Sequence, residues 1–188
     1  MCGTPVHGQP VNSKILLIGQ APGVHEAPRG RPFAHTAGKV LFRWFQEASG
    51  MSEAELRERI YFAAVTRCFP GKNPKGQGDR EPSKFEIRNC RGYLEREVEL
   101  LRPRLVIPVG KLAVREVMNL APSVSLEDVI GKRFFQSYHG WPTVIIPLPH
   151  PSGISRWPKT SPGKELLAAA LALLRKELGD SSVRIHHP

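Results

Sequence analysis

The chain has 188 residues, of which 40% are hydrophobic and 23% are charged, and this fits one domain, 1–188, with a substantial core. No segment approaches the roughly 20 apolar residues of a membrane span, and the first five residues carry no signal-peptide pattern. We therefore expect a soluble, cytoplasmic protein, associated with the nucleoid if bacterial. The formal net charge of +10 favours a polyanionic partner, because neutralising phosphates releases counterions; solubility alone is the alternative.

Residues 19–38 have the composition of a functional loop. They follow the apolar run 15–18, which predicts a buried strand, and Thr36 suits the N-cap of a helix predicted over 39–48. Glycines and prolines throughout the loop suit a backbone that turns sharply and lets a ligand approach its N–H groups. A loop of this length in a compact domain is usually functional or disordered, and Phe33 argues against disorder. We predict an active-site loop, with an ordinary long connection as the alternative.

Helices and strands alternate through the middle of the chain. The predicted elements are a short helix opened by a capping box of Ser52 and Glu55, a strand over 61–66, a loop rich in Gly, Pro and Lys over 67–82, and a helix opened by Ser83 and Glu86 and ending near Leu101.

The last third of the chain continues this alternation and ends in a helix. The predicted elements are a strand over 104–110, a helix over 112–120, an extended segment over 132–139, a strand over 143–148, a loop over 149–157 and a helix beginning at Ser161 and Pro162. Four leucines of this helix form one apolar stripe that favours a core position: Leu167, Leu171, Leu174 and Leu178. Residues 180–188 are expected to be a flexible tail.

This order of elements predicts an α/β fold. We expect a three-layer αβα sandwich with a central, mainly parallel, four-stranded sheet. Ligands bind such sheets at the carboxyl ends of the strands, where the loops after Ile18, Thr66, Gly110 and Leu148 would meet. Several basic residues lie in loops and would form a positive surface there: Arg29, Arg31, Lys72, Lys75, Arg80, Arg156 and Lys159.

Two motifs far apart in the chain resemble the signature motifs of the uracil-DNA glycosylase superfamily. The first is Gly-Gln-Ala-Pro-Gly at 19–23, continued by Gly-Arg-Pro-Phe at 30–33, and the second is His-Pro-Ser at 150–152. Both follow predicted strands, in the order that the family has. The similarity is greatest to the branch that begins Gly-Glu-Ala-Pro-Gly and carries an iron–sulfur cluster, and it covers about residues 14–178.

The resemblance implies a pocket for an extruded base. The implied lining is Gly19, Gln20, Ala21, Pro22, Gly23, Phe33, Ala64 and His150. His150 would donate to the base oxygen that becomes anionic, a backbone N–H near Gln20 would be the second donor, and Phe33 would stack on the base. The alternatives are a histidine satisfied in a Pro-rich turn and a phenylalanine that pins the loop to the core.

The expected partner is DNA, bound by a monomer. A base within a duplex is out of reach, so the enzyme would flip it or act on single strands. Ile154 stands where related enzymes carry an apolar wedge, with Arg156 beside it for a phosphate or for stacking. The expected DNA-binding residues are Ser152, Gly153, Ile154, Ser155 and Arg156. The recognised motifs hold no lysine placed for a Schiff base, although Lys39 and Lys159 are the nearest candidates.

Three positions depart from the pattern of the family. Ala21 stands where the best-known members have an aspartate that orients water or stabilises the cationic sugar, and Glu26 is our candidate for this third catalytic role, with His25 or His35 as poorer options. Gly23 replaces a tyrosine that excludes thymine, which predicts tolerance of 5-substituted pyrimidines. Ala64 replaces an asparagine that reads the edge of uracil, which predicts weaker discrimination.

Three cysteines bear on a cofactor. Cys68 and Cys90 match two of the four cluster ligands of the branch, and Cys2 lies near a third. His7 would be the fourth, since histidine serves as a ligand in some iron–sulfur centres. We therefore expect a [4Fe–4S] cluster on Cys2, His7, Cys68 and Cys90. The alternative is three unconnected thiols.

These expectations combine into a monofunctional DNA glycosylase. It would hydrolyse the N-glycosidic bond of uracil or a related deaminated base in DNA and leave an abasic site. A catalytically silent nucleic-acid-binding module of the same fold is the alternative. An enzyme of nucleotide phosphates is less favoured, because the chain has no Gly-x-x-x-x-Gly-Lys-Ser/Thr motif.

Overall fold

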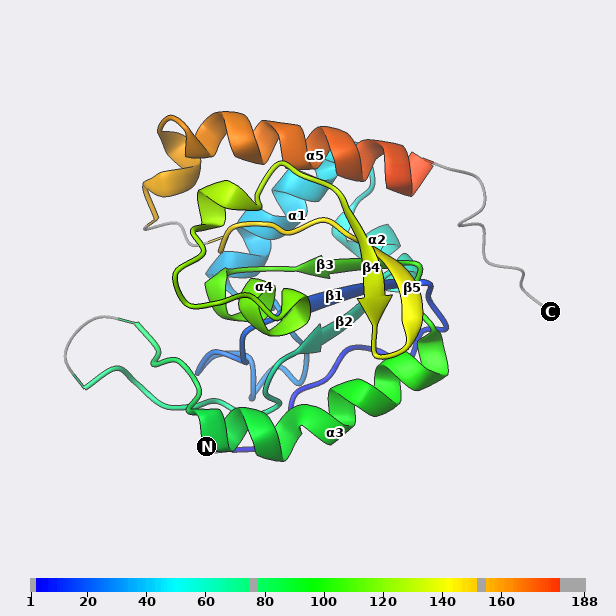
Figure 1. The fold of residues 1–188 in the computed structure, drawn as a ribbon. Helices are drawn as coiled ribbons and strands as arrows, with labels where there is room; N and C mark the ends of the chain where they lie inside the picture. The colour runs from blue at the N-terminus through cyan, green and yellow to red at the C-terminus, as the bar shows by residue number, and fades with distance from the viewer. Residues whose placement is uncertain (1–2, 75–77, 152–154, 180–188) are drawn as a thin grey trace.

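A five-stranded sheet forms the centre of the computed structural model, which describes residues 3–74, 78–151 and 155–179 (Figure 1). Its strands are β1 (Ile15–Gly19), β2 (Tyr61–Ala64), β3 (Leu105–Pro108), β4 (Phe134–Tyr138) and β5 (Trp141–Ile145). Their order across the sheet is β2-β1-β3-β5-β4, and every pair is parallel except β4 with β5. The structure confirms the mainly parallel α/β sheet and adds one edge strand to the four that were predicted.

The additional strand is β4, in the segment predicted to be extended. It pairs antiparallel with β5 from Phe134 opposite Ile145 to Tyr138 opposite Trp141. Two residues with positive φ, His139 at 46° and Gly140 at 87°, connect the strands in a tight hairpin. This pairing also makes β5 begin two residues before the predicted start at 143. Since His-Gly is a weaker hairpin signal than Asn-Gly, the sequence did not indicate the pairing.

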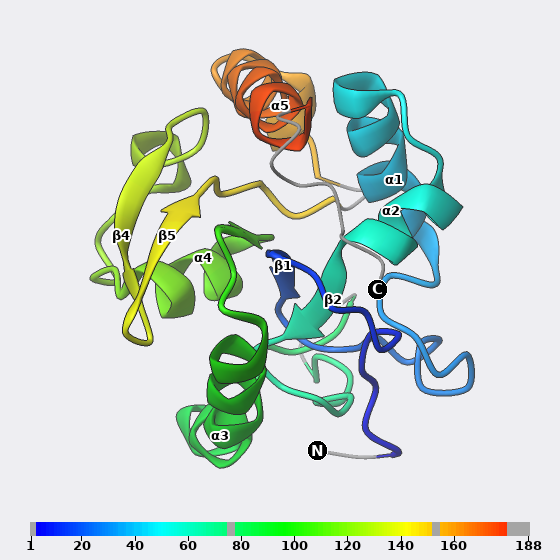
Figure 2. The same ribbon diagram turned by 90° about the vertical axis from the view of Figure 1, so that its right-hand side faces the viewer.

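Helices cover both faces of the sheet. They are α1 (Thr36–Ser49), α2 (Glu53–Arg59), α3 (Lys84–Leu101), α4 (Lys111–Met118) and α5 (Gly163–Gly179), with short 3-10 helices η1 (Leu126–Asp128) and η2 (Trp157–Lys159). In Figure 2, α1, α2 and α5 lie on one side of the sheet, and α3 and α4 on the other. Two clusters of buried apolar side chains, one under each group of helices, fill the space between the layers. The predicted three-layer sandwich is therefore confirmed.

The helix ends follow the local chemistry with one exception. The capping boxes of Ser52 with Glu55 and of Ser83 with Glu86 are both formed. The prediction of Thr36 as the N-cap of α1 is wrong, because His35 holds that position and Thr36 is the first helical residue. The Thr36 hydroxyl lies 3.1 Å from Nδ1 of His35 instead of capping the helix.

The leucine stripe of α5 faces the core, as predicted. Leu167, Leu174 and Leu178 are buried, and Leu171 is half-buried against the cluster that includes α1. No helix within the described parts of the chain is long and apolar enough to cross a membrane. The tail at 180–188 lies outside the described residues.

Candidate active site

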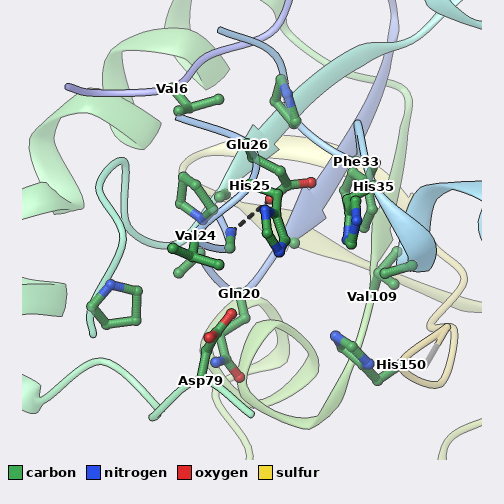
Figure 3. A pocket seen from close by; sticks show the side chains of 18 of the residues that line it. Val6, Gln20, Val24, His25, Glu26, Phe33, His35, Asp79, Val109 and His150 are labelled. Carbon is green, nitrogen blue, oxygen red and sulfur yellow. Dashed lines mark hydrogen bonds between the residues drawn. The ribbon is translucent and has the colours of Figure 1, made fainter. Parts of the chain in front are cut away.

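A cavity of about 360 Å³ opens at the carboxyl ends of the parallel strands (Figure 3). Four loops meet there, as the predicted topology requires. The loop after β1 supplies most of the wall. The rest comes from Val6 near the start of the chain, the ends of β2 and β3, the segment that follows β2 and the loop after β5. The lining includes every residue predicted for the base pocket: Gly19, Gln20, Ala21, Pro22, Gly23, Phe33, Ala64 and His150. Its volume lies within the range of small-ligand sites.

The carboxylate of Glu26 holds the loop after β1 in its turned conformation. One oxygen accepts the N–H of Gly23 at 2.7 Å, and the other accepts the N–H of Ala34 at 3.1 Å. Burial raises the pKa of Glu26, the bonds from the backbone N–H groups oppose this, and the charge of Asp79 adds to it. Glu26 therefore joins the two ends of the loop beside the cavity. The water-orienting role expected of it stays a prediction.

Phe33 forms one wall of the cavity and is held from two sides. Its backbone has a φ of 53°, which is uncommon for a residue other than glycine. Its ring meets the Phe62 ring edge to face at 6.3 Å between centroids, and Arg57 donates to the carbonyl of Phe33 at 3.3 Å. A Cβ on Gly19 would come within 2.9 Å of the ring, so the ring lies directly over the end of β1. Phe33 thus contacts the core, as expected if it pins the loop to the core, and it also lines the cavity.

His150 enters the cavity from the loop after β5. Its ring packs against Gly110, where a Cβ would lie 3.2 Å from Cδ2, and Gly110 has a φ of 88°. The backbone N–H of Gly110 donates to Leu148 at 2.9 Å, which fixes the two loops together. Burial lowers the pKa of His150, although the ring is accessible to solvent through the open cavity. At neutral pH the ring is therefore uncharged and has one N–H to donate.

The first motif is tied to β2 through its backbone. The carbonyls of Gly19 and Gln20 accept the N–H groups of Val65 and Thr66 at 2.9 and 3.1 Å, so the pairing of the two chain segments continues beyond the end of β2 at Ala64. Ala64 is buried in the wall and offers no polar side-chain atom. The polar groups that could read a base must therefore come from other positions.

Two charged residues of the loop after β2 line the cavity, and Lys72 Nζ lies 2.9 Å from Asp79 Oδ1. Lys72 was expected to contribute to a positive surface at this edge of the sheet, whereas sequence reasoning missed Asp79. The signal for Asp79 was only the expectation that its loop opens at this edge. Arg80, expected to contribute to a positive surface, instead pairs with Glu86 through two hydrogen bonds of 2.7 Å. This pair lowers the pKa of Glu86, and the backbone N–H of Ser83 adds to that effect.

His25 and His35 form a pair of rings at the wall of the cavity. Their centroids are 4.3 Å apart. Loss of hydration lowers the pKa of His35, and the charges of His25, Arg29 and Lys39 lower it further. His25 and His35 were considered less suitable candidates than Glu26 for orienting water. Both line the cavity, and this role stays a prediction.

The cysteine positions give an incomplete ligand set. Cys90 is buried on α3 and Cys68 is half-buried after β2; burial raises the pKa of Cys68, and nearby Cys90 contributes. No three His, Cys, Asp or Glu side chains group as metal ligands within residues 3–74, 78–151 and 155–179, so His7 does not join the two thiols there. Its Nδ1 lies 2.9 Å from the carbonyl of Gly8. Cys2 lies outside the described residues, and the described side chains do not complete the four-ligand site of a cluster.

The expected DNA-binding segment is described only at its end. Ser155 is half-buried and Arg156 is exposed before η2, and neither lines the cavity. Ser152, Gly153 and Ile154, like Lys75, lie outside the described residues. Their contact with DNA stays a prediction.

Known proteins resemble this chain over most of its length. The sequence profile of the Uracil DNA glycosylase superfamily matches residues 5–175. The chain is 34% identical over 146 residues to the type-4 uracil-DNA glycosylase of Saccharolobus solfataricus, a match that covers 75% of this chain and 62% of the relative. It is 28% identical over 150 residues to the type-4 enzyme of Sulfurisphaera tokodaii, covering 79% and 63% respectively. The match to the type-5 uracil-DNA glycosylase of Thermus thermophilus is 35% over 124 residues, covering 61% and 53%. The chain thus spans less than two thirds of the length of these relatives.

The close contact of Gly38 with Phe33 predicts that Gly38→Ala destabilises the loop. A Cβ at Gly38 would lie 1.8 Å from the Phe33 carbonyl oxygen, so the backbone must move. We expect the free energy of unfolding to fall by about 1–3 kcal/mol, measured by urea denaturation. Gly92→Ala is the control, because Gly92 lies in α3 with open space around it, and it should gain up to about 1 kcal/mol. Equal denaturation midpoints for Gly38→Ala and wild type would contradict this account of the loop.

The pKa of Glu26 predicts a pH-dependent effect of Glu26→Gln. The folded chain binds a proton at Glu26 at higher pH than the unfolded chain, whose ordinary value is 4.5. Wild type should therefore lose stability relative to the variant as the pH rises above about 4.5. Glu55→Gln is the control with opposite sign, because hydrogen bonds from Ser52 lower the pKa of Glu55. Unfolding measured between about pH 2.5 and 8 tests both, because the effect of Glu55 develops below about pH 4.5 and that of Glu26 above it, and equal slopes for the two variants would refute the assignment.

Proposed function

The chain belongs to the uracil-DNA glycosylase superfamily, and from this we propose that it is a monofunctional DNA glycosylase that releases uracil or a related deaminated base from DNA. The observation that carries the proposal is the cavity in which Phe33 and His150, from opposite ends of the chain, line the same space. The planar ring of Phe33 can stack on a base, and the neutral His150 ring can donate a hydrogen bond to the base as it departs. The alternative of a silent binding module has no support from the relatives, which are named as glycosylases.

Hydrolysis of the glycosidic bond places negative charge on the departing base and positive charge on the sugar. We assign to the neutral His150 ring the donation of one N–H to the base oxygen that becomes anionic, with a backbone N–H near Gln20 as the second donor. Such donors act most strongly when they are already oriented, since no reorganisation is then needed in the transition state. The close packing of the His150 ring against Gly110 supports this role, because it limits the positions that the ring can take.

The sugar side of the reaction lacks the aspartate that Ala21 replaces. Glu26 lies in the cavity wall and is our candidate for the negative charge that favours a cationic sugar. Its two backbone hydrogen bonds also make it a positioning residue for the first motif. The carboxylate can perform both tasks, because accepting an N–H leaves its charge in place.

The lysines near the cavity support simple hydrolysis without a Schiff base. A Schiff base needs an amine that can reach the reacting carbon. Lys72 lines the cavity, but its Nζ is engaged in an ion pair with Asp79, and Lys39 and Lys159 are not part of the described lining. The product is then an abasic site in an intact strand.

DNA is the proposed partner, and the base must leave the stack to reach the cavity. Single-stranded DNA or a flipped nucleotide fits this requirement. Ser155 and Arg156 follow the loop that carries His150 in the chain. This position supports the proposal that the segment 152–156 contacts the DNA strand. Ile154 is the proposed wedge.

An iron–sulfur cluster is a separate expectation on which this reaction does not depend. Cys68 and Cys90 are the described side chains that would bind it. Iron content and visible absorbance of anaerobically purified protein decide the matter. A colourless protein without iron would refute the cluster and leave the glycosylase proposal intact.

Base release from labelled oligonucleotides tests both the function and the role of His150. Wild type should convert uracil, in single strands or in mismatches, to alkali-labile abasic sites. No cleavage with uracil, hypoxanthine, xanthine or 5-hydroxymethyluracil, together with salt-sensitive DNA binding, would favour the binding module instead.

Loss of the His150 donor should slow release by roughly 100- to 1000-fold in His150→Ala, measured as single-turnover rates. His139→Asn is the control: His139 lies in the β4–β5 turn, outside the described lining, and asparagine tolerates its positive φ. A His150→Ala rate equal to that of wild type would remove His150 from the mechanism.

A further inference from the structure

Asp79 occupies a defined place in the cavity wall, beside the last residue of the first motif. A small hairpin holds it: the N–H of Asn73 donates to Gly78 at 3.0 Å, and the N–H of Arg80 donates to Gly71 at 3.0 Å. The neighbouring Arg80 is anchored in turn by its two hydrogen bonds to Glu86 at the start of α3. The backbone position of Asp79, an exposed residue at the rim of the cavity, is therefore held by these backbone hydrogen bonds and by an ion pair outside the cavity.

The carboxylate of Asp79 lies beside Gly23. A Cβ built on Gly23 would be 3.2 Å from Asp79 Oδ2 and 3.8 Å from an oxygen of Glu26. Asp79 Oδ1 accepts from Lys72, whereas Oδ2 has no hydrogen-bond donor among the described residues. In Figure 3 the Asp79 side chain lies on the side of the cavity away from Phe33. The space that a glycine at position 23 was expected to leave open is thus bordered by an acceptor.

A carboxylate accepts hydrogen bonds and cannot donate them. A base that presents an O–H or N–H toward Asp79 gains a charge-assisted hydrogen bond, whereas a carbonyl oxygen in the same place meets like charge. Ala64, the other residue expected to affect specificity, has no polar side-chain atom that could offset this preference. Groups left unpaired in a binding site are an effective way to reject the wrong base.

On the basis of the glycosylase function proposed above, we propose that Asp79 is a specificity-determining residue. Its carboxylate beside Gly23 favours bases that carry a hydroxyl or amino donor at this edge over bases that carry a carbonyl there. Lys72 positions Asp79 by pairing with Oδ1, which leaves Oδ2 beside Gly23 to accept from the base. Plain uracil is then a poorer ligand than a damaged pyrimidine with a donor substituent.

Binding of free bases to the whole chain tests this assignment independently of catalysis. Three matched pairs place a donor or an acceptor at one position each: 5-hydroxymethyluracil against 5-formyluracil at carbon 5, cytosine against uracil at carbon 4, and isocytosine against uracil at carbon 2. Wild type should prefer the donor by about tenfold in at least one pair, measured by ligand-observed NMR titration. Asp79→Asn should reduce that preference to about twofold or less.

Matched variants separate this effect from a loss of folding. Glu81→Gln makes the same chemical change two residues away at an exposed position outside the described lining, and it should keep the wild-type preference. Asp79→Ala removes the charge without adding a donor and should lose the preference as Asp79→Asn does, with the unfolding temperature confirming that both are folded.

The outcomes of this test distinguish the two proposals. An equal preference in wild type and Asp79→Asn, or no donor preference in any pair, would overturn the assignment of Asp79. A donor preference that depends on Asp79 in a protein that releases no base from any oligonucleotide would support the assignment and overturn the glycosylase function alone.

Discussion

The candidate site depends on the closure of residues 19–38 by the carboxylate of Glu26. Two backbone N–H groups, of Gly23 and Ala34, donate to it from the two arms of the loop. Because both donors belong to peptide groups, the bonds fix the path of the chain as well as the position of one side chain. The Phe33 wall, with its left-handed backbone and its contact over Gly19, follows from that path. The cost is a half-buried carboxylate whose pKa is raised by its loss of hydration.

The opposite wall is held by a different device, an ion pair outside the cavity. Arg80 binds Glu86 in the first turn of α3, and the hairpin before it carries Lys72 and Asp79 to the edge of the cavity. The cavity therefore contains two carboxylates, a lysine and three histidines in a chain of net charge +10. The overall charge suits approach to a phosphate backbone. Under the proposed function, Glu26 supplies negative charge toward the sugar and Asp79 faces the base.

Sequence patterns predicted the layers well and the edge of the sheet poorly. Apolar runs such as 15–18 and the capping boxes at Ser52 and Ser83 depend on neighbouring residues, so they can be read locally. The strand β4 alternates between half-buried and exposed residues, and only its pairing with β5 makes it a strand. At the start of α1, Thr36 has the chemistry of a cap, but His35 holds the N-cap position and Thr36 is the first helical residue, in a segment where Gly38 lies close to the Phe33 carbonyl.

The sequence by itself determined the family motifs, the α/β order of elements and the residues Gln20, Phe33 and His150, because motif spacing and hydrophobic periodicity are properties of the chain. Only the tertiary structure decided which charges face the cavity. Asp79 and Lys72 lie in a loop whose composition predicts exposure, and they reach the cavity because parallel strands bring their following loops to one edge. Glu26 was named from the sequence as a candidate site residue, but its hydrogen bonds to Gly23 and Ala34 form only when the loop closes. Side-chain function in this protein is therefore set by long-range backbone geometry, which no local pattern encodes.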